Sequence, residues 1–199
     1  LGFVNAVEKI CDIEVSRRAS YIRVLVAELQ RISSHLVALG TYGLDLGGAL
    51  GGGASLFLYC FREREKILDI MEDLTGTRFH TNINQIGGVR YDVKSDSISK
   101  INKLISDLKP ILEDYTNMIS NDEIFMKRTK NIGVISKKLA EESGGSGPIL
   151  RGSGINFDIR KNKPYECYSE FDFNIPTGQN GDAYDRTIVR MKENVESLN

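Results

Sequence analysis

The stretch SYIRVLVAELQRISSHLVALG, residues 20–40, decides the fold. Its apolar residues recur three and four positions apart, at Ile22, Leu25, Leu29, Ile32, Leu36 and Leu39. Because an α-helix turns once every 3.6 residues or so, this spacing places them on one stripe of an amphipathic helix. The sequence therefore predicts a long helix from about Ser20 to Gly40 with one face in a core.

The same periodicity predicts more helices further along the chain. A second helix begins at Leu56, carries interleaved charges at residues 62–66, and is followed by Gly76, which suits a C-cap. A third covers residues 101–118, and Pro110 should kink or split it because proline has no N–H to donate. The fold predicted from these patterns is mainly α, with a helical bundle as its core.

Side chains that commonly cap helices indicate where shorter helices start. Asn121 or Asp122 suits the N-cap of a fourth helix, Ser136 that of a short fifth, and Asp182 that of a terminal helix. Between the last two, glycines and alternating polar and apolar residues predict a small β-rich or extended segment near residues 145–176. No linker interrupts the chain, so we expect residues 1–199 to form a single domain.

The composition excludes several classes of function. Lys and Arg total 26 against 27 Asp and Glu, so no net basic field attracts nucleic acid. Cys11, Cys60 and Cys167 are too far apart for a CxxC metal site. No apolar run approaches the roughly 20 residues that a membrane-spanning helix needs. We therefore expect no nucleic-acid partner and no transmembrane segment in this chain.

The residues alone point to no catalytic centre. The glycine clusters lack the Lys-Ser/Thr of a phosphate-binding loop and the third glycine of a dinucleotide fingerprint. The only histidines, His35 and His80, have no other ligand at metal-binding spacing, so no metal site is expected. His35 lies at the edge of the apolar stripe, where a histidine usually bonds a neighbouring backbone group or carboxylate.

Several motifs in register resemble the quinone-site subunit of respiratory complex I, the NADH:quinone oxidoreductase family. They include RISSHL at residues 31–36, FRERE at 61–65, Arg78-x-His80, IGGV at 86–89 and Asp158-x-Arg160. That family is itself related to the large subunit of nickel–iron hydrogenases. The resemblance covers nearly the whole chain and implies an internal fragment, without the family's N-terminal β region and C-terminus.

The resemblance implies a part in reducing quinone. Electrons would pass from a neighbouring iron–sulfur cluster to quinone, the substrate, in a proton-translocating enzyme. The segment itself would bind no cofactor: the cluster, flavin and NADH would belong to partner subunits, chiefly the small subunit that holds the terminal cluster. The complex would place the chain peripherally on the cytoplasmic face of the bacterial inner membrane, or its organellar equivalent, and the fragment alone would be inactive.

Three residues match functional positions of the family. Thr41 and Asp45 match positions that line the quinone headgroup pocket, with Asp45 as the catalytic group, since quinone reduction needs proton donors near the carbonyl oxygens. His80 matches a histidine beside the terminal cluster, where a donor raises the reduction potential. From the residues alone, Thr41 would be a helix-terminal threonine, Asp45 a solvated acid and His80 a loop histidine.

Two questions stay open at this stage. The glycine-rich stretch at residues 48–55 is about five residues longer than the family's usual connection, which affects the pocket wall after Asp45. The alternatives for function are the large subunit of a membrane-bound nickel–iron hydrogenase and a non-catalytic helical scaffold subunit.

Overall fold

A computed structural model of the chain describes residues 1–46 and 54–199, so the sequence expectation for residues 48–53 lies outside the described residues. The elements in chain order are α1 (Gly2–Cys11), α2 (Arg17–Leu46), α3 (Ala54–Thr75), β1 (Asn84–Gln85), β2 (Gly88–Val89), α4 (Ser95–Asn121), α5 (Glu123–Thr129), α6 (Lys137–Glu142), α7 (Gly147–Gly152), α8 (Ile159–Asn162), the 3₁₀ helix η1 (Tyr168–Glu170) and α9 (Ala183–Leu198). This confirms the mainly α fold.

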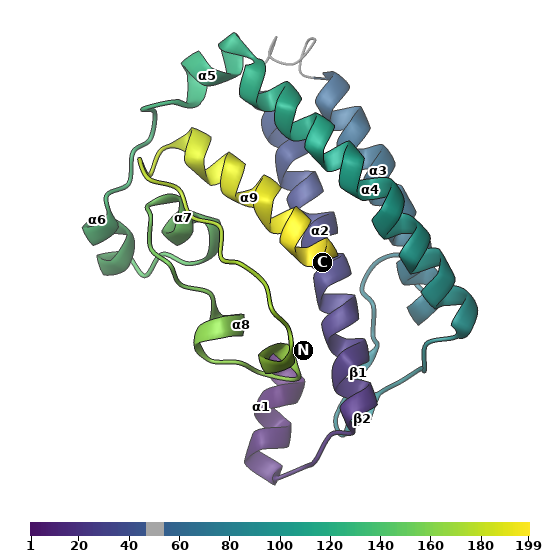
Figure 1. Cartoon of the computed structure of the whole chain (residues 1–199). Helices are drawn as coiled ribbons and strands as arrows, with labels where there is room; N and C mark the ends of the chain where they lie inside the picture. Colours follow the sequence, from purple (N-terminus) through teal and green to yellow (C-terminus); the bar gives the residue numbers. More distant parts are fainter. Residues whose placement is uncertain (47–53) are drawn as a thin grey trace.

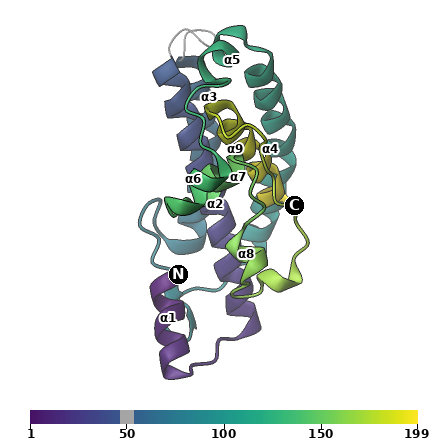
Figure 2. The ribbon, with the colours of Figure 1, turned by 90° about the vertical axis from the view of Figure 1, so that its left-hand side faces the viewer.

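The four long helices α2, α3, α4 and α9 pack side by side and form the bundle (Figure 1). α1 and the hairpin of β1 and β2 lie near one end of the bundle and α5 at the other (Figure 1), and the view from the side shows α1 and α5 at the same opposite ends (Figure 2). The core draws on all four helices: its fully or almost fully buried residues include Leu36, Cys60, Ile67, Leu112, Ile119 and Met191.

The apolar stripe of residues 20–40 faces this core as predicted. Ile32 and Leu36 are almost completely buried, whereas Leu25 lies at the margin of the cluster. The helix does not end near Gly40 but runs on to Leu46. A Cβ placed on Gly43 would lie 2.9 Å from Cδ2 of Leu56, so glycine here allows α3 to approach α2 closely.

Pro110 neither ends nor splits α4, which is continuous from Ser95 to Asn121. Proline breaks a helix by removing one N–H donor and by crowding the preceding turn. Pro110 lies on the exposed side of α4, where solvent can satisfy the carbonyl that has lost its partner. Exposure thus explains why the helix tolerates it.

The predicted helix ends are largely confirmed. Asp122, Ser136 and Asp182 each cap the following helix, and their side chains accept backbone N–H groups at 2.6, 3.2 and 2.8 Å. Gly76 follows the last residue of α3 with φ of +78°, and its N–H donates to the carbonyl oxygen of Glu72 at 2.7 Å. These caps fix where the connecting segments leave the bundle.

The segment near residues 145–176 consists of extended loops interrupted by α7, α8 and η1. Of the two forms expected there, loops are found rather than strands. Within the described ranges, strands occur only at β1 and β2, which pair antiparallel with Asn84 opposite Val89. Of the helices described, none is both long and apolar enough to cross a membrane.

Candidate functional site

Thr41 and Asp45 lie on the last turns of α2, four residues apart and therefore on the same side of the helix. Both are exposed. The hydroxyl of Thr41 donates to the carbonyl oxygen of Val37 at 2.8 Å, so its proton is already used within the helix. Within residues 1–46 and 54–199, no cation forms an ion pair with Asp45, which leaves its carboxylate open to solvent or a ligand.

His80 lies in the turn that follows α3 and has a left-handed backbone with φ of +54°. A non-glycine residue rarely adopts this conformation, although histidine is among the residues enriched there. Its side chain is exposed. The turn thus presents the imidazole outward, where another molecule can reach it.

Arg78 holds this turn against α3. Its guanidinium forms ion pairs with Asp69 and Glu65, both at 2.5 Å, and with Glu72 at 3.3 Å. The hydrogen bonds that Arg78 donates to Asp69 first and to Glu72 second raise the pKa of Arg78 above its ordinary value. These three carboxylates all lie on α3, and together they fix Arg78, which is two positions before His80.

The structure does not bring the three predicted residues together. Thr41 and Asp45 lie at the end of α2 that adjoins the start of α3, and His80 follows the far end of α3 (Figure 1). With 22 residues, α3 spans about 33 Å at 1.5 Å per residue. The chain therefore contains two separate candidate positions, one at each end of the α2–α3 pair.

His35 has the structural role expected of it. Its Nε2 lies 2.7 Å from Oε2 of Glu193, and Oε1 of Glu193 accepts from Nε of Arg151 at 2.5 Å. The side chain of Glu193 is fully buried. Burial pushes its pKa upward, but the hydrogen bonds from His35 and Arg151 outweigh burial, so the pKa of Glu193 lies below its ordinary value.

A second buried group of charges surrounds Glu28. Its carboxylate accepts from Arg160 at 3.0 Å, Tyr168 at 2.5 Å and Ser197 at 2.6 Å. Burial raises the pKa of Glu28, and the nearby charges of Arg31 and Arg160 more than reverse this effect. The carboxylate is therefore ionised and ties α2 to α8, η1 and the end of α9.

A hollow of about 540 Å³ opens beside Glu28 and is walled mainly by apolar and aromatic side chains, among them Tyr21, Phe171 and Phe173. Its polar groups bond to each other: Tyr21 donates to Glu170 at 2.6 Å, as Tyr168 does to Glu28. The hollow thus offers apolar contact, and its charged residues are engaged within the protein.

Arg23 joins α1 and the β hairpin to the bundle. Its fully buried guanidinium pairs with Glu8 at 2.7 Å and Glu166 at 2.9 Å, and donates to the carbonyl oxygens of Gln85 and Gly88, both at 2.8 Å. The hydrogen bond from Arg23 is the main reason that the pKa of Glu8 is lowered. This cluster holds the β hairpin against α2 at Gln85 and Gly88.

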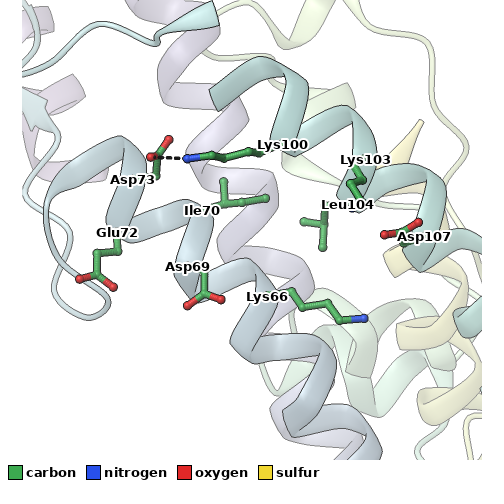
Figure 3. Close-up of a pocket in the computed structure, with 9 residues that line it drawn as sticks. All are labelled: Lys66, Asp69, Ile70, Glu72, Asp73, Lys100, Lys103, Leu104 and Asp107. Atoms are coloured by element: carbon green, nitrogen blue, oxygen red, sulfur yellow. Dashed lines mark hydrogen bonds and ion pairs between the residues drawn. The ribbon is translucent and has the colours of Figure 1, made fainter. Parts of the chain in front are cut away.

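A shallow groove of about 490 Å³ runs between α3 and α4 and is lined by both acids and lysines. Figure 3 shows Asp73 and Lys100 meeting across it at 2.7 Å, with Lys66 and Asp107 further along the groove. Since opposite charges are mixed along the groove, it has no single sign of charge that would select an ionic ligand.

The side chains that are placed by the structure form no group of three or more His, Cys, Asp and Glu that could hold a metal ion. The cysteines are dispersed as well: Cys11 is exposed, and Cys60 and Cys167 are buried. Burial, with a smaller effect of Glu63, raises the pKa of Cys60 to about 12, so this thiol stays protonated. Thr41, Asp45 and His80 are candidates from the family resemblance alone.

Comparison with known proteins decides the family. The family model described as "Respiratory-chain NADH dehydrogenase, 49 Kd subunit" matches residues 51–199. The chain belongs to this family. The matched residues include His80 and Arg78, whereas Thr41 and Asp45 precede them.

Several named proteins match all or nearly all of the chain. An NADH-quinone oxidoreductase subunit of Desulforamulus reducens is 42% identical over 98% of this chain and 52% of its own length. The corresponding protein of Chlorobium chlorochromatii is 46% identical over 100% of this chain and 50% of its own length. A longer NADH-quinone oxidoreductase subunit of Aquifex aeolicus is 44% identical over 100% of this chain and 33% of its own length.

The chain thus spans about half the length of the first two relatives. Because those matches cover 98% and 100% of the chain, they include the segment that holds Thr41 and Asp45. The names of these relatives favour the quinone oxidoreductase family over the hydrogenase alternative. Sequence patterns do not reveal the buried clusters of Arg23, Glu28 and Glu193 in this member of the 49 kDa family. The one signal in the sequence is the Asp158-x-Arg160 motif of the resemblance, whose Arg160 bonds to Glu28.

Proposed function

We propose that this chain forms part of the quinone-reducing site of a proton-translocating NADH:quinone oxidoreductase. Membership of the 49 kDa family is the observation that carries this proposal. The relatives' names include quinone as the acceptor, which supports the same substrate class here. The chain would contribute one wall of the chamber in which quinone is reduced.

The exposed pair at the end of α2 has the chemistry that this role needs. Reduction of quinone to quinol takes up two protons, and a carboxyl group within hydrogen-bond reach can supply one. Asp45 is exposed and unpaired among the described residues, and the hydroxyl of Thr41 lies on the same side of the helix. We assign proton donation to Asp45 and positioning of the quinone oxygen to Thr41.

His80 has a different role in the proposal, at the other end of α3. The exposed imidazole would face an iron–sulfur cluster held by a neighbouring small subunit and would donate a hydrogen bond toward the cluster. The cluster, flavin and NADH would all belong to partner subunits, and this segment would hold no cofactor itself. The assembled enzyme would lie peripherally on the cytoplasmic face of the membrane.

Asp45→Asn in the assembled enzyme tests the proposal. The amide keeps the shape of the side chain but removes the ionisable proton, so reduction of an artificial acceptor by NADH should persist while quinone reduction falls at least tenfold. Asp107→Asn, which removes an exposed acid from α4, is the matched control and should change neither rate. Unchanged quinone turnover in Asp45→Asn would remove Asp45 from the mechanism.

The runner-up function is a non-catalytic scaffold. The observation that favours it is the hydrogen bond from the Thr41 hydroxyl to Val37, which occupies the donor within the helix. A scaffold predicts normal quinone turnover for Asp45→Asn and also for variants of Thr41. The two functions therefore differ in the same measurement.

A further inference from the structure

A small hollow of about 220 Å³ lies between α2 and α9 and has two arginines in its wall. Its lining residues are Ala38, Leu39, Tyr42, Ala183, Arg186, Thr187 and Arg190. Arg186 and Arg190 are four residues apart on α9 and therefore neighbours on one face of the helix. Both are half-buried. The wall of the hollow thus concentrates two positive charges.

The partners of these arginines are backbone carbonyl groups. Arg186 donates to the carbonyl oxygens of Gly181 at 2.7 Å and Gly133 at 3.1 Å. Arg190 donates to the carbonyl oxygen of Arg186 at 3.0 Å. Among the residues that the structure places, no carboxylate forms an ion pair with either guanidinium. The two charges therefore lack a counter-charge in direct contact.

The acids closest along α9 are committed elsewhere. Asp182 accepts the N–H groups of Asn131 and Asp185, both at 2.8 Å. Asp185 accepts the N–H groups of Gln179 at 2.8 Å and Asn180 at 2.6 Å. Glu193, one turn after Arg190, is held by His35 and Arg151. None of these three carboxylates is free to turn toward the hollow.

The electrostatics of Arg190 favour the binding of an anion. Burial is the main influence that lowers the pKa of Arg190, Glu193 opposes it, and the positive charge of Arg186 adds to the lowering. A partly desolvated charge without a counter-ion is costly, and an ion that supplies the opposite charge removes much of that cost. Guanidinium groups bind carboxylate and phosphate oxygens with paired, charge-assisted hydrogen bonds.

Tyr42 adds a third donor to the hollow. Its ring packs on Phe125 with centroids 6.3 Å apart, and its hydroxyl has no hydrogen-bond partner among the described residues. Burial raises the pKa of Tyr42, so the hydroxyl stays protonated and can donate. A phenol O–H on α2 and guanidinium groups on α9 therefore line the same space from opposite sides.

From this arrangement we propose that the hollow between α2 and α9 binds a small oxyanion, with Arg190 and Tyr42 as its donors and Arg186 as a second charge. Its volume is below the roughly 300–1,000 Å³ of pockets for drug-sized ligands, which suits a carboxylate or phosphate group rather than a large molecule. The proposal stands independently of the role of Asp45, because none of its residues is assigned to quinone reduction.

Binding of radiolabelled inorganic phosphate tests the site, measured by equilibrium dialysis of the assembled complex at constant ionic strength. The difference between wild type and each variant isolates this hollow from phosphate bound elsewhere. Arg190→Gln should weaken the phosphate affinity of the site at least tenfold, and Arg190→Lys less, because lysine keeps the charge but loses the paired donors. Lys192→Gln removes an exposed charge from the same helix and should bind as wild type.

Tyr42→Phe provides a second variant if Arg190→Gln does not assemble, and we expect it to weaken binding several-fold. Competition by acetate distinguishes the sources of the oxyanion: displacement of phosphate indicates a site for either group, and no displacement indicates a phosphate site. The proposal is overturned if wild type, Arg190→Gln and Tyr42→Phe bind phosphate equally. It is also overturned if the difference in bound phosphate between wild type and Arg190→Gln does not saturate at phosphate concentrations up to about 10 mM, beyond which affinity is negligible.

Discussion

His35 and Glu193 meet across the contact between α2 and α9, with 2.7 Å between Nε2 and Oε2. An ionised carboxylate only accepts hydrogen bonds, so the imidazole donates from Nε2. The same carboxylate accepts from Arg151, which lies on α7. One buried acid therefore connects three helices that are distant in sequence.

Replacing this acid should cost considerable stability. Glu193→Gln leaves Arg151 buried with a weakened partner, and we expect a loss of about 3 kcal/mol in the free energy of unfolding. Urea unfolding followed by circular dichroism measures it. Glu113→Gln, on the exposed side of α4, is the control and should stay within about 0.5 kcal/mol of wild type. Similar values for the two variants would contradict the buried role.

The pH dependence of the same variant follows from the lowered pKa of Glu193. A carboxyl group with a folded pKa below its unfolded value stabilises the fold fully above the unfolded pKa, and this contribution is lost as pH falls through the folded pKa. The difference in the free energy of unfolding between wild type and Glu193→Gln should therefore be constant near pH 7 and shrink below about pH 4. If this difference stays constant down to about pH 3, the ionised carboxylate of Glu193 is not the source of the stabilisation.

Gly43→Ala tests the close contact of α2 and α3. The added Cβ would lie 2.9 Å from Cδ2 and 3.3 Å from Cβ of Leu56, which is buried. Overpacking of about 1–3 kcal/mol should exceed the roughly 1 kcal/mol that alanine gains in helix propensity. Gly2→Ala in α1 meets nothing within 4 Å and should be neutral or stabilising by the same urea measurement. A stabilised Gly43→Ala would mean that the helices can separate freely.

His80→Asn separates a redox role from a role in the turn. Asparagine tolerates the left-handed backbone of this position, so the turn should survive while the imidazole is removed. In wild type the potential of the neighbouring cluster should fall with rising pH, by up to about 59 mV per unit for one electron. The variant should have a lower potential without this dependence in a redox titration followed by electron paramagnetic resonance.

Asn82→Ala, which removes an exposed side chain two residues after His80, provides the control for local disturbance and should keep the pH dependence. If the dependence persists in His80→Asn, another group couples the proton and His80 only shapes the turn.

Thr41→Val examines the second donor of the proposed quinone wall. In the proposed site the hydroxyl turns from Val37 to the quinone oxygen, so its removal loses a neutral hydrogen bond of about 1 kcal/mol and should raise the KM for quinone roughly five-fold with little change in kcat. Thr41→Ser keeps the hydroxyl and should restore the KM. Steady-state kinetics with a soluble quinone measures the KM of wild type, Thr41→Val and Thr41→Ser. The scaffold function predicts the same KM for all three proteins.

The sequence predicts those features that depend on local spacing. The stripe that ends with Leu36 and Leu39 and the cap at Asp182 are set within one or two turns of chain, so their patterns are visible in the residues themselves. The sequence underestimates the length of α2 because Gly40 resembles a helix end. Only the neighbouring helix reveals why glycine is needed at Gly43.

The candidate site is less predictable because its contacts are non-local. Arg151 and Glu193 are 42 residues apart, and no periodicity marks them as a pair. The distance between Asp45 and His80 likewise depends on the direction of α3, not on their spacing in sequence. Resemblance to the family identifies both residues as candidates, and their placement at opposite ends of α3 requires the structure.

The burial of Arg23 has a consequence for how the chain is made. Its partner Glu166 follows 143 residues later, and at a synthesis rate of about 5–20 residues per second that residue emerges roughly 7–30 s after Arg23. Until then the guanidinium can pair with Glu8 but cannot be fully enclosed. The end of the bundle that holds α1 and the β hairpin therefore closes late. In a nascent chain paused before Glu166, α1 should be accessible to proteases and chaperones.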